Sequence, residues 1–327
     1  MGTRSIFFMH KNPRAVYKNL SRFVVGAIFG LSILLNGCTS LTRRMTGENV
    51  NAPSGKAANA TSNQFGTPSN IAQSNKKVAV ILGPGGYKSI AEVGVLKELI
   101  KAKIPIQAVA GVEWGALVGA LYAQHGQINE AEWKLYKLSA LHLGAVSFFT
   151  RRRETKSVGV IAHFLRQNLA NEDVSKTSLP FMCPTLNLIL GTVQIQTHGN
   201  LPEVVQNCLA LPPIFNPRGS LMAAPLSLPD IVMDLRAQGY NVIILVNVLG
   251  DGDLFYHSRT VVNDSTIALW DEIRRQIFSV ESMVTDVIDV DTQGISLDDF
   301  SARNRLLTAG EVAGDKAAGT LSNKYGF

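Results

Sequence analysis

The sequence has few of the residues that build metal or redox centres. It contains three cysteines and six histidines among 327 residues, and neither type is clustered with the spacing of a metal site. We therefore expect no metal ion and no cofactor. Cys183 and Cys208 lie in apolar stretches beside Pro184 and Leu209, which favours buried free thiols. An oxidising compartment would allow the two cysteines to pair instead.

Beyond its N-terminus the chain also lacks an excess of charge of either sign. The formal net charge is +6, but residues 1–37 contain five Lys or Arg residues and no acid. The rest of the chain is therefore close to neutral, without the basic surface that nucleic-acid-binding proteins need. We expect no nucleic-acid partner.

The apolar run near the N-terminus is too short for a permanent membrane-spanning helix. It covers residues 23–35, only 13 residues, whereas a span needs about 20. A basic stretch followed by a short apolar run is typical of a secretory signal peptide. Residues 35–38 read Leu-Asn-Gly-Cys, which resembles a bacterial lipobox, and this resemblance implies cleavage after residue 37 and acylation of Cys38. An ordinary cleaved signal with a chance cysteine is the alternative.

An acylated Cys38 would anchor the protein to a membrane, because each buried CH₂ contributes about 0.8 kcal/mol. Thr39, rather than an aspartate, follows the cysteine, which by analogy favours the outer membrane. Residues 38–75 are rich in Asn, Ser, Thr, Ala, Gly and Pro, which predicts a flexible polar tether. We therefore expect a lipoprotein that faces the periplasm, with its folded domain at residues 76–327.

The remaining sequence alternates between apolar runs and helical periodicity. This order predicts an α/β fold with a mainly parallel central sheet covered on both faces. The predicted strands are residues 78–82, 106–110, 181–188, 193–197 and 240–248. The predicted helices are residues 90–102, 116–123, 130–143, 158–169 and 229–238.

Residues 111–115, Gly-Val-Glu-Trp-Gly, have the frame of a serine-hydrolase nucleophile elbow. Glycines stand two residues on either side of Glu113, a short apolar strand precedes them, and a helix of small residues follows. Glu113 occupies the place of the nucleophilic serine, and Trp114 adds bulk beside the turn. The sequence thus predicts an elbow-like turn without its reactive hydroxyl.

Four blocks of the sequence follow the order found in one enzyme family. They are the glycine-rich loop at 83–88 with its continuation at 92–99, the elbow and helix at 111–123, residues 208–217 with the 228–229 and 242–248 segments, and the tail at 295–311. Over residues 76–318 the chain therefore resembles the patatin-like phospholipases, which implies their three-layer fold. The resemblance also implies which residues form the oxyanion loop and its surroundings: Gly83, Gly85, Gly86, Lys88 and Trp114.

That family uses a Ser–Asp dyad, in which the serine attacks an acyl ester and the aspartate is its base. The resemblance places the serine position at Glu113 and the aspartate position near Leu221. No acid occurs between Gln206 and Leu228, so no neighbouring residue replaces the aspartate. The sequence therefore predicts a phospholipase-related pseudoenzyme that binds a lipid or acyl group, or an envelope protein partner.

Glu113 at the start of a helix suggests two kinds of chemistry. The helix dipole is expected to lower its pKa, which would make it a poor base, and its carboxylate is expected to accept hydrogen bonds from the amides of Gly85, Gly86 and Trp114. The alternative is a divergent acyl hydrolase in which Glu113 acts on a water molecule. For Lys88, contact with a lipid head group and simple solvation both remain open.

Overall fold

The computed structural model describes residues 76–138, 142, 155–256 and 262–327. Cys38, the predicted signal peptide and the predicted tether lie outside these residues. Their prediction therefore stays a prediction.

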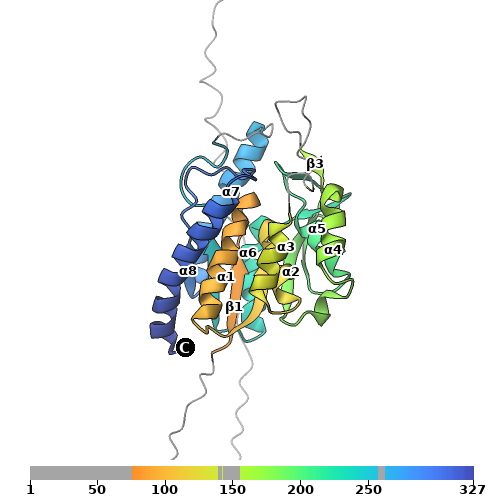
Figure 1. Cartoon of the computed structure of the whole chain (residues 1–327). Coiled ribbons are helices and arrows are strands. Elements are labelled where there is room, and N and C mark those ends of the chain that lie inside the picture. The colour runs from red at the N-terminus through yellow and green to blue at the C-terminus, as the bar shows by residue number, and fades with distance from the viewer. Residues whose placement is uncertain (1–75, 139–141, 143–154, 257–261) are drawn as a thin grey trace, which may run out of the picture. The chain divides into compact units, whose positions relative to one another are not determined.

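Seven strands in the described part of the chain form one sheet with the order β5-β4-β2-β1-β8-β9, and β7 pairs with β4 (Figure 1). The pairs β1–β2, β1–β8, β2–β4 and β8–β9 are parallel, whereas β5 and β7 run antiparallel to β4. The mainly parallel sheet predicted from the sequence is therefore confirmed. The strands are β1 (Val78–Leu82), β2 (Ile106–Gly111), β4 (Phe181–Asn187), β5 (Thr192–Gln196), β7 (Leu221–Ala223), β8 (Val242–Asn247) and β9 (Asp286–Asp289).

Helices cover both faces of this sheet. Alternate residues of β1 point to opposite sides: Val78, Val80 and Leu82 join one buried apolar cluster, and Ala79 and Ile81 join the other. The first cluster includes residues of α1 (Ala91–Lys101), α2 (Trp114–Ala123), α3 (Ile128–Tyr136), α4 (Ala162–Asn168), α5 (Leu201–Cys208) and α8 (Arg303–Tyr325). The second includes residues of α6 (Leu228–Ala237) and α7 (Asp264–Val280). The three-layer arrangement follows directly from this alternation.

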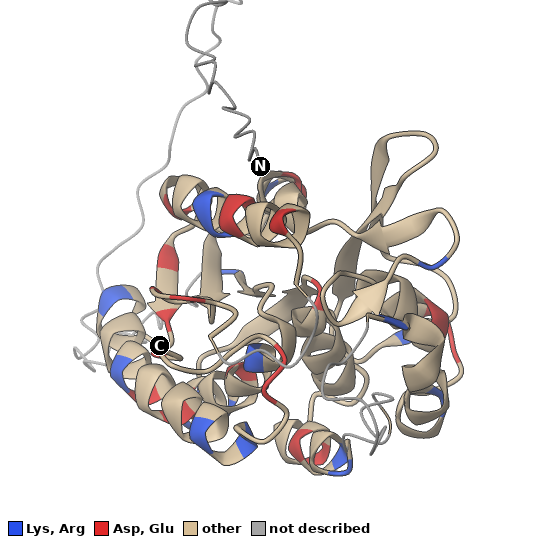
Figure 2. Ribbon diagram, turned by 90° about the horizontal axis from the view of Figure 1, so that it is seen from above, with Lys and Arg blue, Asp and Glu red and all other residues tan. Residues whose placement is uncertain are grey.

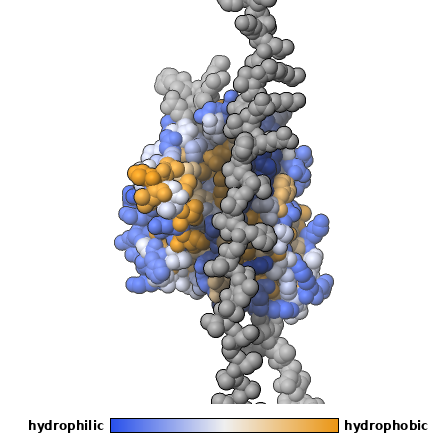
Figure 3. Space-filling view, turned by 180° about the vertical axis from the view of Figure 1, so that it is seen from behind, coloured by the Kyte–Doolittle hydropathy of each residue, from blue (hydrophilic) through white to orange (hydrophobic). Residues whose placement is uncertain are grey.

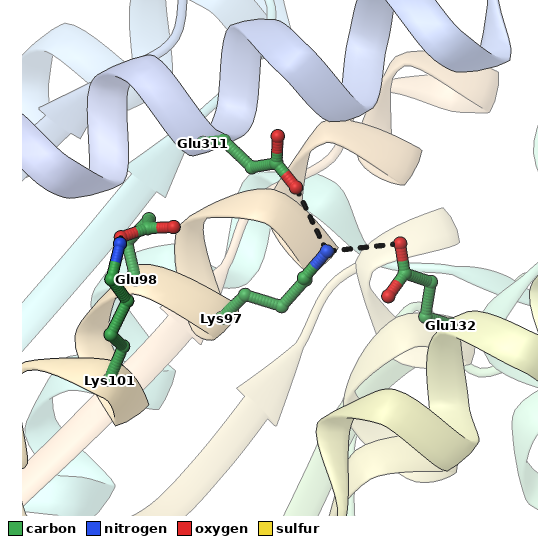
Figure 4. A network of polar contacts seen from close by, with 5 residues as sticks. All are labelled: Lys97, Glu98, Lys101, Glu132 and Glu311. Atoms are coloured by element: carbon green, nitrogen blue, oxygen red, sulfur yellow. Dashed lines mark hydrogen bonds and ion pairs between the residues drawn. The ribbon is translucent and has the colours of Figure 1, made fainter.

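Helix α1 is held between α3 and α8 by an ion-pair network (Figure 4). Lys97 of α1 lies 3.2 Å from Glu132 of α3 and 2.9 Å from Glu311 of α8. The hydrogen bond to Glu311 is the main reason that the pKa of Lys97 is raised. Half-exposed pairs of this kind contribute little stability each, but they fix which helix faces meet.

Glycines let α1 and α8 approach closely. A Cβ atom on Gly310 would lie 1.8 Å from the carbonyl oxygen of Ala91, and one on Gly94 would lie 2.4 Å from that of Leu307. The two backbones are therefore nearly in contact, as small residues allow.

The predicted elements match most of the observed ones. The helix predicted for 130–143 is shorter, since α3 ends at Tyr136, and residues 139–141 and 143 lie outside the described residues. The segment predicted as a helix at 158–169 begins as a 3₁₀ turn at Val158–Ile161 and becomes α4 at Ala162. Helices α5, α7 and α8 and strands β7 and β9 were not among the predicted elements.

The prediction of free thiols at Cys183 and Cys208 is wrong. The two cysteines form a disulfide between β4 and α5, with their Cα atoms 6.2 Å apart. Apolar neighbours in the sequence indicate burial, and both residues are buried, but they do not show which elements pack together.

Among the helices of the described residues, none has the length and apolar composition of a transmembrane helix.

Candidate functional site

The elbow predicted at residues 111–115 is a strand–turn–helix corner. Strand β2 ends at Gly111 and α2 begins at Trp114, with Glu113 at the tip of the turn. Glu113 has φ 55° and ψ −122°, a conformation that costs a residue with a side chain on the order of 1–3 kcal/mol. Such strain is found where a side chain must be held in a fixed direction at a sharp turn.

The two flanking glycines are required by close backbone contacts. A Cβ atom on Gly111 would lie 2.4 Å from Cα of Ala116, and one on Gly115 would lie 2.5 Å from the carbonyl oxygen of Leu82. A side chain at either position would clash with the neighbouring backbone, so only glycine fits there. The corner packs directly against the end of β1.

The carboxylate of Glu113 is bound by the glycine-rich loop. Its Oε2 atom accepts hydrogen bonds from the amides of Gly86 at 2.8 Å and Gly85 at 3.2 Å. Its Oε1 atom has no hydrogen-bond partner among the described residues, and the side chain is fully buried. The predicted contacts with Gly85 and Gly86 are thus present, and these are the amides that the resemblance assigns to the oxyanion loop.

The predicted direction of the Glu113 pKa is wrong. Desolvation by complete burial raises the pKa to about 7, although the amides of Trp114, Gly86 and Gly85 each lower it. The sequence indicated the helix N-terminus but not the absence of solvent, and here burial outweighs the dipole and the hydrogen bonds. A carboxyl group with this pKa exists in both protonation states near neutral pH.

A second buried carboxyl group, Glu92, influences the site. Glu92 lies in the first turn of α1, and burial together with the nearby charge of Glu113 raises its pKa well above the usual range. The Gly83 amide acts in the opposite direction and lowers this pKa, but it donates its hydrogen bond to the Val246 carbonyl at 3.1 Å. Neither Glu92 oxygen has a hydrogen-bond partner among the described residues. The sequence analysis missed this pair, because an acid at helical spacing in a first turn looks like an ordinary helix-start residue.

Lys88 is buried, which contradicts the solvated alternative. Its exposed fraction is 2%, and its Nζ donates to the Leu249 carbonyl at 3.1 Å. Desolvation, with a further contribution from Arg274, lowers its pKa to about 8, while Asp253 raises it. The turn at Gly86–Ile90 directs this side chain beneath the chain that follows β8, which the local sequence could not show.

Trp114 is the centre of an aromatic cluster beside the elbow. Its ring stacks on Phe215 at 6.1 Å and meets Tyr87 edge-on at 5.6 Å, and Tyr87 in turn meets Phe300 at 4.9 Å. The indole is fully buried, and its Nε1 has no partner among the described residues. The bulk predicted for this position therefore fills space next to Glu113.

The tail segment at 295–300 closes over the glycine-rich loop. The amide of Tyr87 donates to the Leu297 carbonyl at 2.7 Å, and a Cβ atom on Gly86 would lie 2.6 Å from that same oxygen. Segments of the chain some 210 residues apart thus meet at one point, which only the tertiary structure brings about.

Leu221 lies at the start of β7, in register with Asn187 of β4. Strand β4 begins beside the end of β2, with Phe181 opposite Val109, so Ala223, which pairs with Thr185, lies closer to the elbow along the sheet than Leu221 does. Val112 and Ala223 share one buried cluster. Neither position carries a group that could act as a base.

Other features of the described residues do not add chemistry to the elbow. No group of three His, Cys, Asp or Glu residues in the described ranges could hold a metal ion. Of the two cavities that we describe, one lies against α1, α3 and α8 and the other between β9 and α8, and Glu113 lines neither of them.

Comparison with known proteins agrees with this geometry. Residues 80–225 match the family model of the patatin-like phospholipases. The chain is 25% identical over 210 residues to lysophospholipase nte1 of Aspergillus niger, which covers 61% of this chain and 13% of that protein. It is 26% identical over 188 residues to mouse patatin-like phospholipase domain-containing protein 6, covering 52% of this chain and 13% of that protein.

Among solved structures, VipD from Legionella pneumophila aligns with a TM-score of 0.41 and 12% identity, over 77% of this chain and 67% of that one. The chain spans only about 13% of the length of the two relatives compared by sequence, lysophospholipase nte1 and mouse patatin-like phospholipase domain-containing protein 6. The glycine-rich loop, the strained elbow and the family match lead to one conclusion: the chain contains a patatin-like phospholipase domain, which the family model matches at residues 80–225.

Proposed function

We propose that this protein is a catalytically inactive, phospholipase-related lipoprotein of a bacterial cell envelope. In this proposal the protein is anchored by acyl chains on Cys38 and faces the periplasm from the outer membrane. Its role is to bind a lipid or acyl group, or an envelope protein.

One observation carries this proposal: the carboxylate of Glu113 occupies the amides of the glycine-rich loop. An acyl-transfer enzyme needs such amides free, because they stabilise the negative charge that develops on the substrate oxygen. Here Gly85 and Gly86 donate to Glu113 Oε2, and the side chain is fully buried. A substrate carbonyl would have to displace a carboxylate that is covalently part of the turn.

The chemistry of a carboxylate also argues against ester cleavage by Glu113 as a nucleophile. Attack on an ester would form an anhydride, which is more reactive than the ester itself. A serine would instead form a stable acyl-enzyme, activated by an adjacent base. Neither Leu221 nor Ala223 provides that base.

The second candidate function is a divergent acyl hydrolase in which Glu113 is the general base. Its pKa of about 7 favours this alternative, because a base works best when its pKa lies near the operating pH. Its complete burial and its bonds to the loop amides favour the inactive protein. The two candidates differ in whether any hydrolysis depends on Glu113.

The test is an assay of the full-length protein on lysophospholipid, phospholipid and short acyl esters, since relatives carry the name lysophospholipase. The parent and the Glu113→Gln variant are compared, because glutamine keeps the size and an accepting oxygen but cannot act as a base. We expect no turnover from either protein. Turnover by the parent that disappears in Glu113→Gln would establish the hydrolase instead.

Restoring the dyad tests whether the site is otherwise intact. Glu113→Ser combined with Leu221→Asp, or with Ala223→Asp as the sheet register favours, is expected to give weak esterase activity. Glu113→Ser alone is the matched control, which lacks the base. A folded double variant without activity would show that the site around Trp114 is too filled to admit an ester.

The remaining parts of the proposal have separate support. The disulfide between Cys183 and Cys208 suits an oxidising compartment such as the periplasm. Mass spectrometry of lipid that co-purifies with the native protein tests the binding role. A specific lipid, absent from an unrelated lipoprotein purified in the same way, would support lipid binding, and no enrichment would favour a protein partner.

A further inference from the structure

The tip of the β4–β5 hairpin exposes three consecutive large apolar side chains. Leu188, Ile189 and Leu190 have exposed fractions of 48%, 81% and 68%. In the view from above, the hairpin projects from the body of the domain and carries no charged residue (Figure 2). The view from behind shows a cluster of apolar atoms at one edge of the molecule (Figure 3). Isolated apolar residues on a surface are common, but a projecting apolar tip needs an explanation.

The surroundings of this tip are poor in charge. Between Lys176 and Asp230 the only charged side chains are Glu203 and Arg218. About a quarter of the residues in an ordinary domain are charged, so a stretch of this length with two charges is unusual. The tip therefore leaves water without the cost of desolvating ionised groups.

The backbone of the tip is already satisfied by internal hydrogen bonds. The amides of Ile189 and Leu190 donate to Asn187 Oδ1 at 3.0 and 3.1 Å, and that of Gly191 donates to the Asn187 carbonyl at 2.8 Å. The amide of Leu188 donates to the Ser220 carbonyl at 2.7 Å. Unpaired amides are what keep a loop out of a bilayer, and here four consecutive amides are paired.

Arg218 provides a cation beside the apolar tip. It lies in the turn before β7, next to Ser220, which binds the backbone of Leu188. Its side chain is exposed, and its NH1 donates to the neutral amide oxygen of Asn207 at 2.9 Å. An exposed guanidinium next to an apolar tip matches the order of a phospholipid, in which phosphate lies above the acyl chains.

The tip lies at the same end of the sheet as the elbow. Strand β4 runs parallel to β2 and starts beside the last residues of β2, with Met182 opposite Ala110. Strand β4 therefore continues beyond the carboxyl end of β2, where Glu113 lies. A surface bound at the tip would therefore face the end of the domain that carries the family's site.

We propose that residues 188–190 insert into the interfacial layer of a phospholipid bilayer, with Arg218 at the level of the phosphates. This inference rests on the proposed function, since it takes the bilayer to be the membrane to which acylated Cys38 anchors the protein. It adds a second contact that fixes the orientation of the domain, which a long tether alone cannot do.

The experiment places a fluorescent reporter at the tip of the full-length protein reconstituted into phosphatidylcholine–phosphatidylglycerol vesicles. The variant is Ile189→Trp, and the matched control is Val312→Trp, an apolar position on α8 with an exposed fraction of 67%. Lipids with brominated acyl chains quench tryptophan only within the bilayer. Because an interfacial segment lies about 5–10 Å deep, we expect the emission added by Ile189→Trp to fall at least twofold and that added by Val312→Trp to stay unchanged.

Three further measurements make the result decisive. Vesicle flotation shows whether the protein is bound at all, so that failure of the Cys38 anchor is separated from failure of the tip. Bound protein whose Ile189→Trp emission is not quenched would overturn the proposal and leave the anchor intact. The double variant Ile189→Asp, Leu190→Asp should keep the thermal midpoint of the parent but should not insert. On vesicles, a water-soluble protease should therefore cleave the tip of the double variant and leave the tip of the parent intact. A dimer that this double variant converts to a monomer, without vesicle insertion by the parent, would assign the tip to self-association and refute the membrane contact.

Discussion

At the scale of single residues, the central feature is a carboxyl group held without solvent at a strained turn. Glu113 has a positive φ, lies fully buried, and accepts two amide hydrogen bonds on one oxygen. Burial is the dominant influence on its protonation, and Glu92 adds a second carboxyl group that also resists ionisation. Both groups therefore link stability to pH.

The first prediction concerns this linkage. The pKa of Glu113 rises from 4.5 to about 7 on folding, so between these values the folded protein holds a proton that the unfolded chain has lost. The free energy of unfolding must therefore fall as the pH rises through this range. The contribution of Glu113 to this fall is at most about 3 kcal/mol. In Glu113→Gln this contribution is absent, and the variant should be more stable than the parent at pH 8 and similar at pH 4.

Urea unfolding at pH 4, 6 and 8 measures the effect. The control is Glu203→Gln, an exposed acid on α5, which should follow the parent at every pH. A Glu113→Gln variant with the pH profile of the parent would show that Glu113 is already ionised in the folded protein.

At the scale of secondary-structure elements, α1 is held in place by its contact with α8. Gly94 and Gly310 make the contact close, and Lys97 joins Glu311 at its edge. Because α1 follows the glycine-rich loop directly, its position also sets the position of that loop.

The second prediction tests the glycine contact. Gly310→Ala would bring a methyl group onto the Ala91 carbonyl, so the helices must separate, and we expect a loss of about 1–3 kcal/mol in the free energy of unfolding. Gly319→Ala lies on the same helix with open space around it and should instead gain about 0.5–1 kcal/mol. Equal effects at the two positions, measured by chemical denaturation, would exclude the close helix contact as the cause.

The third prediction concerns the disulfide between β4 and α5. Replacing Cys183 and Cys208 by alanine together should cost about 3 kcal/mol, because the unfolded chain is no longer constrained by a loop of this length. A reducing agent should destabilise the parent by a similar amount and leave the double variant unaffected. Insensitivity of the parent to reduction would indicate that the thiols are free after all.

At the scale of the whole molecule, the sequence places a proposed anchor at one end of the chain and a folded domain at the other. The fourth prediction is that the N-terminal peptide of the mature protein begins at Cys38 and carries acyl chains, read by mass spectrometry. Cys38→Ser should abolish this modification and shift the protein out of the washed membrane fraction. An unmodified mature N-terminus at any other residue would rule out the lipoprotein proposal.

The parts predicted from the sequence are those set by local pattern. The apolar run of β1 and the periodicity of α1 define their own structures, and the spacing of Gly111 and Gly115 around residue 113 was enough to indicate the elbow. The amphipathic helices α5, α7 and α8 are missing from the prediction, although their periodicity was present in the sequence. The short strand β9 is recognisable only through its pairing with β8.

By itself, the sequence determined the mainly parallel α/β fold, the elbow frame and the identity of residue 113, because strand and helix periods and glycine spacing act over a few residues. Only the tertiary structure decided the protonation of Glu113, the burial of Lys88 and the pairing of Cys183 with Cys208. Each of these depends on how much solvent remains and on which distant segments meet. Burial and long-range contact are properties of the packed chain, and no local pattern contains them.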